Sequence, residues 1–194
     1  MQNDLRRLDE IKKGCLILAD PNIINDPYFN RAIVLITENS KDEVVGFIIN
    51  KPLEYNFQDI FSGIGKNHII YNGGPVNKDN LYYIHNRPNL ISNSIEVSNN
   101  IFWGGDFTDV KNHIKNNKIK SNNIRFFSGY SGWSISQLKN EIKEKSWIIT
   151  NNRFNDKILK SKTNELWKEE IKKLGNDYKI WSNAPENPNL NLFI

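Results

Sequence analysis

Two short apolar runs constrain the fold of this chain more than any other feature of its sequence. Residues 15–19 and 32–36 are apolar at every position, without the alternation of a strand that has one face in water. Runs of this length and composition are typical of strands that are covered on both faces. We therefore expect both segments in the middle of a sheet, with other elements packed on each side.

Apolar, β-branched segments and helical spacings continue this pattern along the chain. Strands are predicted at residues 15–19, 32–37, 44–50, 68–72, 81–85, 124–127 and 146–150. Helices are predicted at residues 4–13, 106–117, 134–145 and 164–174. Strands that come first and helices that come later favour an α+β fold.

The chain has the length of one domain. Its 194 residues contain no repeat and no clear linker, and a domain typically has about 150 residues. We expect residues 1–194 to form a single domain with a core of residues 10–180. Two prolines predict an extended tail over residues 181–194.

Composition excludes several classes of protein. The single cysteine, Cys15, rules out a disulfide framework, and His68, His85 and His113 share no metal-ligand spacing. We therefore expect no metal and no other cofactor. No apolar run reaches the roughly 18 residues of a membrane span, and the N-terminus lacks a signal peptide. These features predict a cytoplasmic protein with no membrane contact.

Charge is distributed unevenly. The formal net charge is +4, with −2 on residues 1–100 and +6 on residues 101–194. A basic half attracts nucleic acid or other anions, although lysine-rich helices are also ordinary solvated surface. Arginine is scarce and no helix shows a base-reading face, so we expect any nucleic-acid binding to be weak and without sequence preference.

The segment 127–138 is the most informative for function. It predicts a strand, a glycine turn and a helix start. Ser134 and Gln137 fit a capping box, and Trp133 with Leu138 fits a hydrophobic staple. Local helix initiation therefore explains these four residues without a function.

Three interpretations of the preceding Gly129-Tyr130-Ser131-Gly132 stay open. Backbone N–H groups at the start of the helix could hold an anion. Ser131 could be a nucleophile on a strand-to-helix elbow, but the second glycine comes one residue early for that motif. The segment could also be a structural turn only.

A candidate ligand site combines this segment with two other strand ends that are followed by glycine or proline. Its residues are Asn50, Lys51, Gly73, Gly74, Pro75, Gly129, Tyr130, Ser131 and Gly132. An amide, a cation and a phenol suit an anionic or planar ligand, and loops on a rigid sheet often carry function. The hypothesis requires Lys51, Gly74 and Tyr130 to border one cleft. The alternative is that the glycine turns merely close the sheet.

Other reactive side chains have ordinary explanations, and no catalytic residue is assigned. Cys15 lies in an apolar run, where burial raises the pKa of a thiol and leaves it inert. His85 is expected to be a polar strand end rather than a metal ligand. Asp20, Asp26 and Glu38 fit caps and surface charges.

Together these segments resemble the YqgE/AlgH family of bacterial proteins. The resemblance covers about residues 10–180, with matching residues at 14–21, 26–35, 46–52, 73–76, 129–133, 137, 138, 141 and 147. The sequence departs from the family pattern at Ser131, where alanine is usual, and at Asn39, where histidine is usual.

The resemblance implies a mixed sheet with a small closed barrel-like core surrounded by helices. It also implies a cytosolic regulator of transcription, with nucleotide or nucleic-acid binding by structural analogy. Two classes of function follow. The first is a non-enzymatic regulatory or binding protein. The second is a small-ligand binding protein or an enzyme with a glycine-loop pocket, for which the ligand is an anion or a nucleotide.

Overall fold

The two apolar runs lie side by side as strands. They form β1 (Leu16–Ala19) and β2 (Ile33–Asn39), which pair antiparallel. Leu16 and Leu18 pack in one hydrophobic cluster, and Ile17 packs in another. Every residue of β1 is buried, so the expectation of a strand covered on both faces is confirmed.

The computed structural model describes residues 11–65, 67–151, 158–160 and 165–185. The other strands are β3 (Glu43–Ile48), β4 (Pro52–Asn56), β5 (Ile69–Asn72), β6 (Val76–His85), β7 (Ile95–Ser98), β8 (Ile101–Trp103), β9 (Ile124–Ser134) and β10 (Trp147–Thr150). The helices are the 3-10 turn η2 (Pro21–Ile23), α1 (Phe57–Ile60), α2 (Phe107–Lys115), α3 (Ile135–Lys143), α4 (Leu166–Lys172) and α5 (Asn176–Asn183). None of the helices within these ranges is long and apolar enough to cross a bilayer.

One mixed sheet connects the strands of the described residues, in the order β10-β1-β2-β3-β9-β6-β8-β7. The parallel pair is β5 with β9, and β4 extends the sheet beyond β5. The end strands β10 and β7 do not pair with each other, so this order is open. The α+β fold with a mixed sheet is confirmed, whereas the closed barrel-like core is not.

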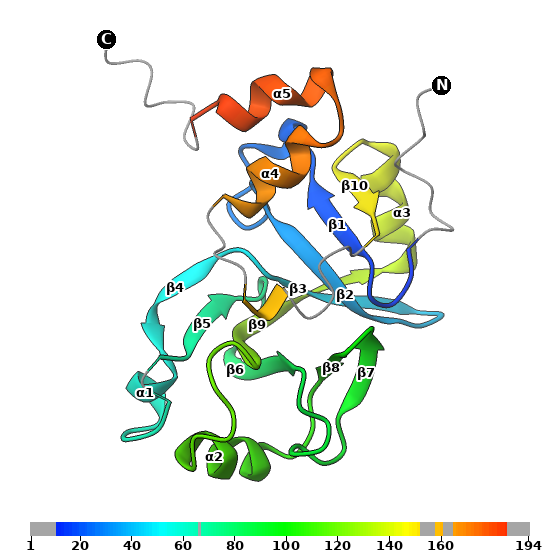
Figure 1. Cartoon of the computed structure of the whole chain (residues 1–194). Coiled ribbons are helices and arrows are strands. Elements are labelled where there is room, and N and C mark those ends of the chain that lie inside the picture. The colour runs from blue at the N-terminus through cyan, green and yellow to red at the C-terminus, as the bar shows by residue number, and fades with distance from the viewer. Residues whose placement is uncertain (1–10, 66, 152–157, 161–164, 186–194) are drawn as a thin grey trace.

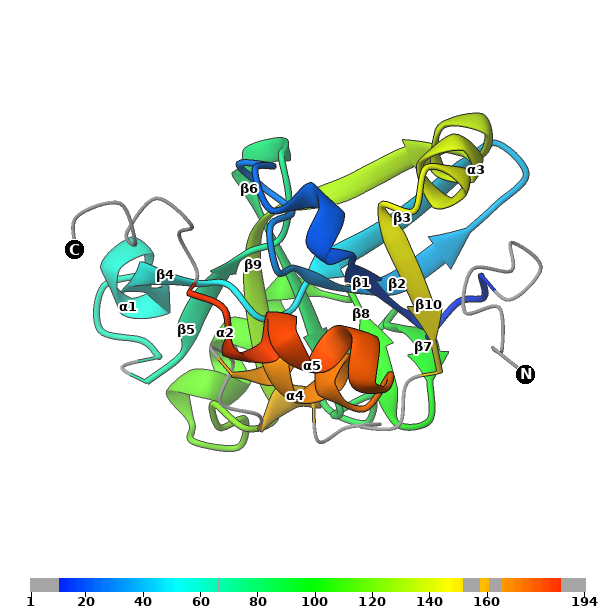
Figure 2. The same ribbon diagram turned by 90° about the horizontal axis from the view of Figure 1, so that it is seen from above.

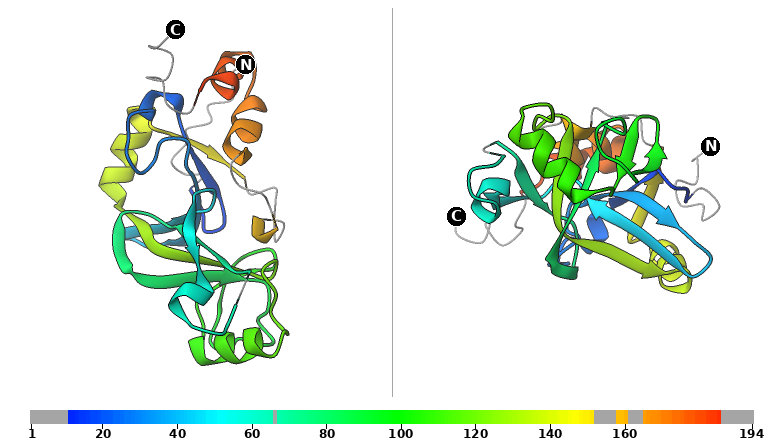
Figure 3. Two further views of the ribbon diagram at one scale, coloured as in Figure 1. Left: turned by 90° about the vertical axis from the view of Figure 1, so that its left-hand side faces the viewer. Right: turned by 90° about the horizontal axis from the view of Figure 1, so that it is seen from below.

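Helices cover the sheet on both sides of β1. Figure 3 (left) shows α3 on one side of β1 and α4 with α5 on the other. Leu138 and Ile142 of α3 pack with Ile17, while Trp167 and Ile171 of α4 pack on the opposite cluster. Figure 1 shows α2 at the far end of the molecule from α4 and α5, and Figure 2 shows α1 across from α3.

Several predicted boundaries need correction. The strand predicted at residues 124–127 continues to Ser134, straight through the expected glycine turn. Residues 181–183 of the expected tail belong to α5, which packs on α4, and residues 186–194 lie outside the described residues. Of the helix predicted at residues 4–13, only residues 11–13 are described, and they are not helical.

Candidate functional site

Gly73 and Gly74 lie directly against Gly129, in what we call the glycine crossing. A Cβ atom on Gly73 would overlap the carbonyl oxygen of Gly129, and one on Gly74 would overlap Ser131 and Tyr130. Gly129 has φ +71°, and a Cβ atom there would overlap the carbonyl oxygens of Val76 and Gly74, at 2.7 and 2.8 Å. The glycines therefore let two backbone segments touch and leave no space for a ligand between them.

Ser131 is part of this packing. It is fully buried, and its Oγ donates a 3.0 Å hydrogen bond to the carbonyl oxygen of Gly73. Ser131 pairs with Gly46 of β3 inside a continuous strand, not at a strand-to-helix elbow. The turn predicted at residues 129–132 is wrong, because the chain continues through them as strand β9. Ser131 therefore lacks the strand-to-helix geometry of a nucleophile elbow.

The helix start after β9 follows the sequence prediction only in part. Ser134 Oγ accepts the backbone N–H of Gln137, as in a capping box. The Gln137 side chain does not return to Ser134 but donates to Glu141 Oε1. The other oxygen of Glu141 accepts both indole N–H groups of Trp133 and Trp147, at 2.9 and 2.7 Å. These side chains join β9, α3 and β10, which is a structural role.

Tyr130 and Gly132 line an open groove of about 340 Å³. The other lining residues are Asp42, Glu43, Val76, Trp133 and Ser134. Burial and the nearby Glu43 and Tyr82 raise the pKa of Tyr130 above its ordinary value. Two carboxylates and no cation among these residues make this groove unsuited to an anion.

Asn50 and Lys51 line a different cavity of about 420 Å³. Its other lining residues in the described chain are Arg31, Pro52, Glu165, Trp167 and Lys168. Gly74 lines neither of these two cavities, and Pro75 is exposed at the start of β6. The structure thus brings the glycine segments together, but Lys51 and Tyr130 line separate cavities. A ligand-binding role for the nine residues stays a prediction.

Asn50 positions the backbone at the edge of this cavity. Its Oδ1 accepts the N–H of Ile33 and its Nδ2 donates to the carbonyl oxygen of Arg31, both at 2.8 Å. Arg31 has φ +55°, a left-handed conformation that costs a non-glycine residue about 1 kcal/mol or more. The buried amide of Asn50 therefore stabilises an unfavourable backbone that orients the Arg31 side chain.

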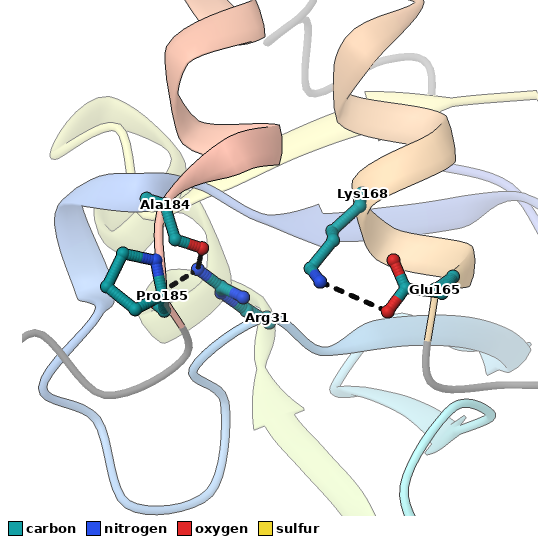
Figure 4. Close-up of polar contacts among 5 residues, drawn as sticks. All are labelled: Arg31, Glu165, Lys168, Ala184 and Pro185. Carbon is teal, nitrogen blue, oxygen red and sulfur yellow. Dashed lines mark hydrogen bonds and ion pairs between the residues drawn. The ribbon is translucent and has the colours of Figure 1, made fainter. Parts of the chain in front are cut away.

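Arg31 is the central cation of the cavity. Its guanidinium lies 5.3 Å from the centre of the Trp167 ring, and Nη2 donates to the carbonyl oxygens of Ala184 and Pro185, each at 2.7 Å. Trp167 is itself fixed by a 2.9 Å hydrogen bond to Ala19. Figure 4 shows the Arg31 guanidinium pointing toward Ala184 and Pro185 at the end of α5, with the ion pair of Lys168 on α4 and its N-cap Glu165 to one side.

The lining is more cationic than anionic. Lys168 Nζ pairs with Glu165 at 3.1 Å, and Lys51 Nζ donates to the carbonyl oxygen of Tyr28 at 2.8 Å. Next to Asn50 in the chain, the carbonyl oxygen of Ile49 accepts a 2.5 Å hydrogen bond from Nη1 of the buried Arg125. Burial lowers the pKa of Arg125 to about 10, so it remains charged at neutral pH. Among the described lining residues, three cations and one carboxylate favour an anionic ligand.

Metal and thiol chemistry find no support in the described residues. No group of three His, Cys, Asp or Glu residues there could hold a metal. His85 is fully buried, with both ring nitrogens bonded to the backbone of Gly104 and Arg87, and burial lowers its pKa to about 4. Cys15 is buried and its pKa is raised by that burial.

Sequence reasoning did not select Arg31, Trp167 or Lys168. Arg31 stands in the segment 26–35 that carries the family resemblance, and it precedes an apolar run. An arginine next to a fully buried strand needs polar partners, so this position could have marked the cavity. Trp167 and Lys168 lie within the helix predicted at residues 164–174, and no sequence pattern marked them as functional.

These features define an α+β protein on one mixed sheet, with a cation-lined cavity beneath its C-terminal helices. The chain belongs to the AlgH-like family, whose model matches residues 16–179. The resemblance found in the sequence is therefore confirmed. Similar proteins include the UPF0301 protein of Chlorobaculum tepidum, 34% identical over 93% of this chain and 96% of that relative. One from Bacteroides fragilis is 36% identical, over 92% of this chain and 91% of the relative.

Solved structures share the fold. A crystal structure of a protein from Corynebacterium diphtheriae matches with a TM-score of 0.69 and 17% identity, over 90% of this chain and 93% of the other. The solution structure of AlgH from Pseudomonas aeruginosa matches with a TM-score of 0.68 and 21% identity, over 89% and 94%. At these identities the likeness concerns the fold alone.

Proposed function

We propose that this protein is a non-enzymatic, cytoplasmic regulatory protein that binds a small anion in the cavity of Arg31, Lys51 and Lys168. The observation that carries the proposal is the convergence of these three cations, from β-strand ends and α4, on a cavity of about 420 Å³. Small-ligand sites are concave and use a few precisely placed polar or charged groups to fix the orientation of the ligand.

Binding is favoured over catalysis by the residue types present. The described lining of this cavity includes no Ser, Cys, His or Tyr, and its single carboxylate, Glu165, is paired with Lys168. A nucleophile or a general base must lie within hydrogen-bond reach of the reacting atom. The arrangement therefore supports recognition of an anion more than its chemical conversion.

Direct DNA recognition is less well supported. Lys111 and Lys115 lie on α2, whereas Lys139 and Lys143 lie on α3, and these two helices are far apart in the molecule (Figure 1). The basic excess of the second half is thus divided between distant surfaces. A role in transcription, which the family resemblance implies, is proposed here as ligand-dependent, with only weak nucleic-acid contact.

Calorimetric titration with inorganic phosphate at constant ionic strength tests the anion site. Arg31→Gln should weaken binding by about tenfold or more, since it removes charge-assisted hydrogen bonds. Lys168→Gln should weaken it by about threefold, as expected for a partly exposed charge.

Lys115→Gln is the matched control, because it removes one exposed lysine from α2 at the other end of the molecule. Its phosphate affinity should equal that of the unmodified protein. Absence of phosphate binding, or equal weakening in all three variants, would contradict the proposed site.

A further inference from the structure

The hydrogen bonds of Arg31 restrict how the cavity can bind an anion. A guanidinium grips an oxyanion with two parallel N–H groups, either Nε with Nη2 or Nη1 with Nη2. Both of these pairs include Nη2. In this structure Nη2 is the nitrogen that donates to Ala184 and Pro185, at 2.7 Å each.

Each pair uses one of the two N–H groups of Nη2, and Nη2 already donates to two carbonyl oxygens. Two-point binding of an anion and the contact with the end of α5 therefore compete for the same donors. While Ala184 and Pro185 hold Nη2, an anion can receive only single, separate hydrogen bonds from Nε and Nη1. A carboxylate or phosphate that binds through two oxygens must displace at least one of these carbonyl oxygens. A spherical anion such as chloride has no second oxygen and gains nothing from displacing them.

The C-terminal end of α5 depends strongly on Arg31. The helix has eight residues, its N-cap Gly175 offers no side-chain cap, and Ile180 is 71% exposed. Near its first turn, Tyr178 packs against the core cluster and donates a long 3.5 Å hydrogen bond to Asp20. A helix this short is marginal by itself, so its last turn loosens when Arg31 leaves.

We propose that the cavity takes an oxyanion with two adjacent oxygens, a phosphate or carboxylate group. When this ligand binds, the Arg31 side chain transfers its hydrogen bonds from the end of α5 to the ligand. The inference rests on the proposed anion site and adds its ligand class and its regulation. The signal is the release of Ala184 and Pro185, more than 150 residues from Arg31 along the chain. Ligand occupancy is thereby converted into a change at the C-terminal surface.

Hydrogen–deuterium exchange of the peptide spanning residues 176–184 tests this transfer of Arg31, with phosphate affinity measured in parallel. Saturating phosphate should accelerate exchange in the last turn of α5 by about tenfold, the factor for losing one charge-assisted hydrogen bond. Chloride at equal ionic strength should change it by less than about twofold, which is within the effect of screening alone.

Two variants separate the steps. Arg31→Lys keeps the positive charge but removes the paired N–H groups of the guanidinium. Hydrogen–deuterium exchange in α5 should therefore be fast before phosphate is added and should not respond to phosphate. Lys168→Gln weakens binding but leaves Arg31 intact, so the full acceleration should return at saturating phosphate.

The outcomes distinguish the two proposals. If phosphate binds but hydrogen–deuterium exchange in α5 is unchanged or slower, the proposed transfer of Arg31 is overturned while the anion site stands. Equal acceleration by chloride also overturns it, because two adjacent oxygens are then not required. No phosphate binding at all overturns both proposals.

Discussion

The glycine crossing and the cation cavity lie close together in the chain's fold, yet they use opposite means. At the crossing, Gly73 and Gly129 have no side chains, and backbone touches backbone without intervening space. In the cavity, Arg31, Asn50 and Lys51 have long or polar side chains that hold backbone carbonyls around a volume of about 420 Å³. The first region excludes ligands by contact, while the second keeps room for one.

This difference shows how a glycine-rich strand end should be interpreted. Glycine exposes the backbone either to a ligand or to another segment of the same chain. Here Gly73 and Gly74 meet Gly129 and Ser131, so the exposure serves packing. The candidate site lies instead where the buried Arg31 and two half-buried lysines line a cavity. Burying a charged side chain requires partners, and these also fix its orientation.

The largest expected effect tests whether the crossing is purely structural. Gly73→Ala places a Cβ atom on the carbonyl oxygen of Gly129, and two paired backbones cannot yield cheaply. We expect a loss of at least about 3 kcal/mol of unfolding free energy, at the upper end of overpacking costs. Thermal denaturation should show a Tm lower by roughly 10 °C.

Gly63→Ala is the control for that change. Gly63 has φ +78° and nothing within 4 Å of an added Cβ, so only backbone strain of about 1 kcal/mol is expected. Equal destabilisation by the two substitutions would show that the close approach at Gly73 contributes nothing.

Asn50→Ala is expected to have the next largest effect, since Asn50 supports the cavity from its edge. The substitution leaves the Ile33 N–H and the Arg31 carbonyl oxygen without their side-chain partner. We expect a loss of about 2 kcal/mol, limited because water in the cavity replaces part of the contact. Urea denaturation measures it, and no loss would show that Arg31 keeps its backbone conformation unaided.

Much of the fold could be predicted because local patterns agreed with it. The apolar run predicts β1, and the helix predicted at residues 106–117 corresponds to α2, where the Asp106 carboxylate accepts the Thr108 N–H. The strands β4, β7 and β8 were not predicted. They have only five, four and three residues, which is too few for a hydrophobic period to stand out.

The site was harder to predict, because its geometry depends on residues far apart in the chain. Arg31, Lys51 and Trp167 meet only after α4 has packed on β1. The glycine segments lie against one another, and sequence cannot tell a backbone that faces solvent from one that faces Gly129. Ser131 shows the same limit, since its neighbours resemble a turn and the structure has a strand.

Ser131→Ala probes the crossing with a smaller change. The Oγ atom donates to the carbonyl oxygen of Gly73, which also accepts the backbone N–H of Ile48, so the acceptor stays paired without Ser131. We expect a loss of about 1 kcal/mol in denaturant unfolding and unchanged phosphate affinity. A large loss of phosphate affinity with intact stability would return Ser131 to the list of functional residues.

The smallest expected effect is that of Tyr130→Ala on phosphate affinity, and it tests whether the two regions act separately. Tyr130 lines the groove with Asp42 and Glu43, whose carboxylates repel anions, and shares no cavity with Lys51. We expect phosphate affinity within about twofold of the unmodified protein, because the substitution removes no charge and Tyr130 does not line the cavity of Arg31, Lys51 and Lys168. Stability should fall by about 1 kcal/mol through the lost edge-to-face contact with Tyr82, and Tyr130→Phe, which keeps that contact, should restore it. A decrease in phosphate affinity beyond about fivefold in Tyr130→Ala, but not in Tyr130→Phe, would link the groove to the cavity and favour one site that includes both Lys51 and Tyr130.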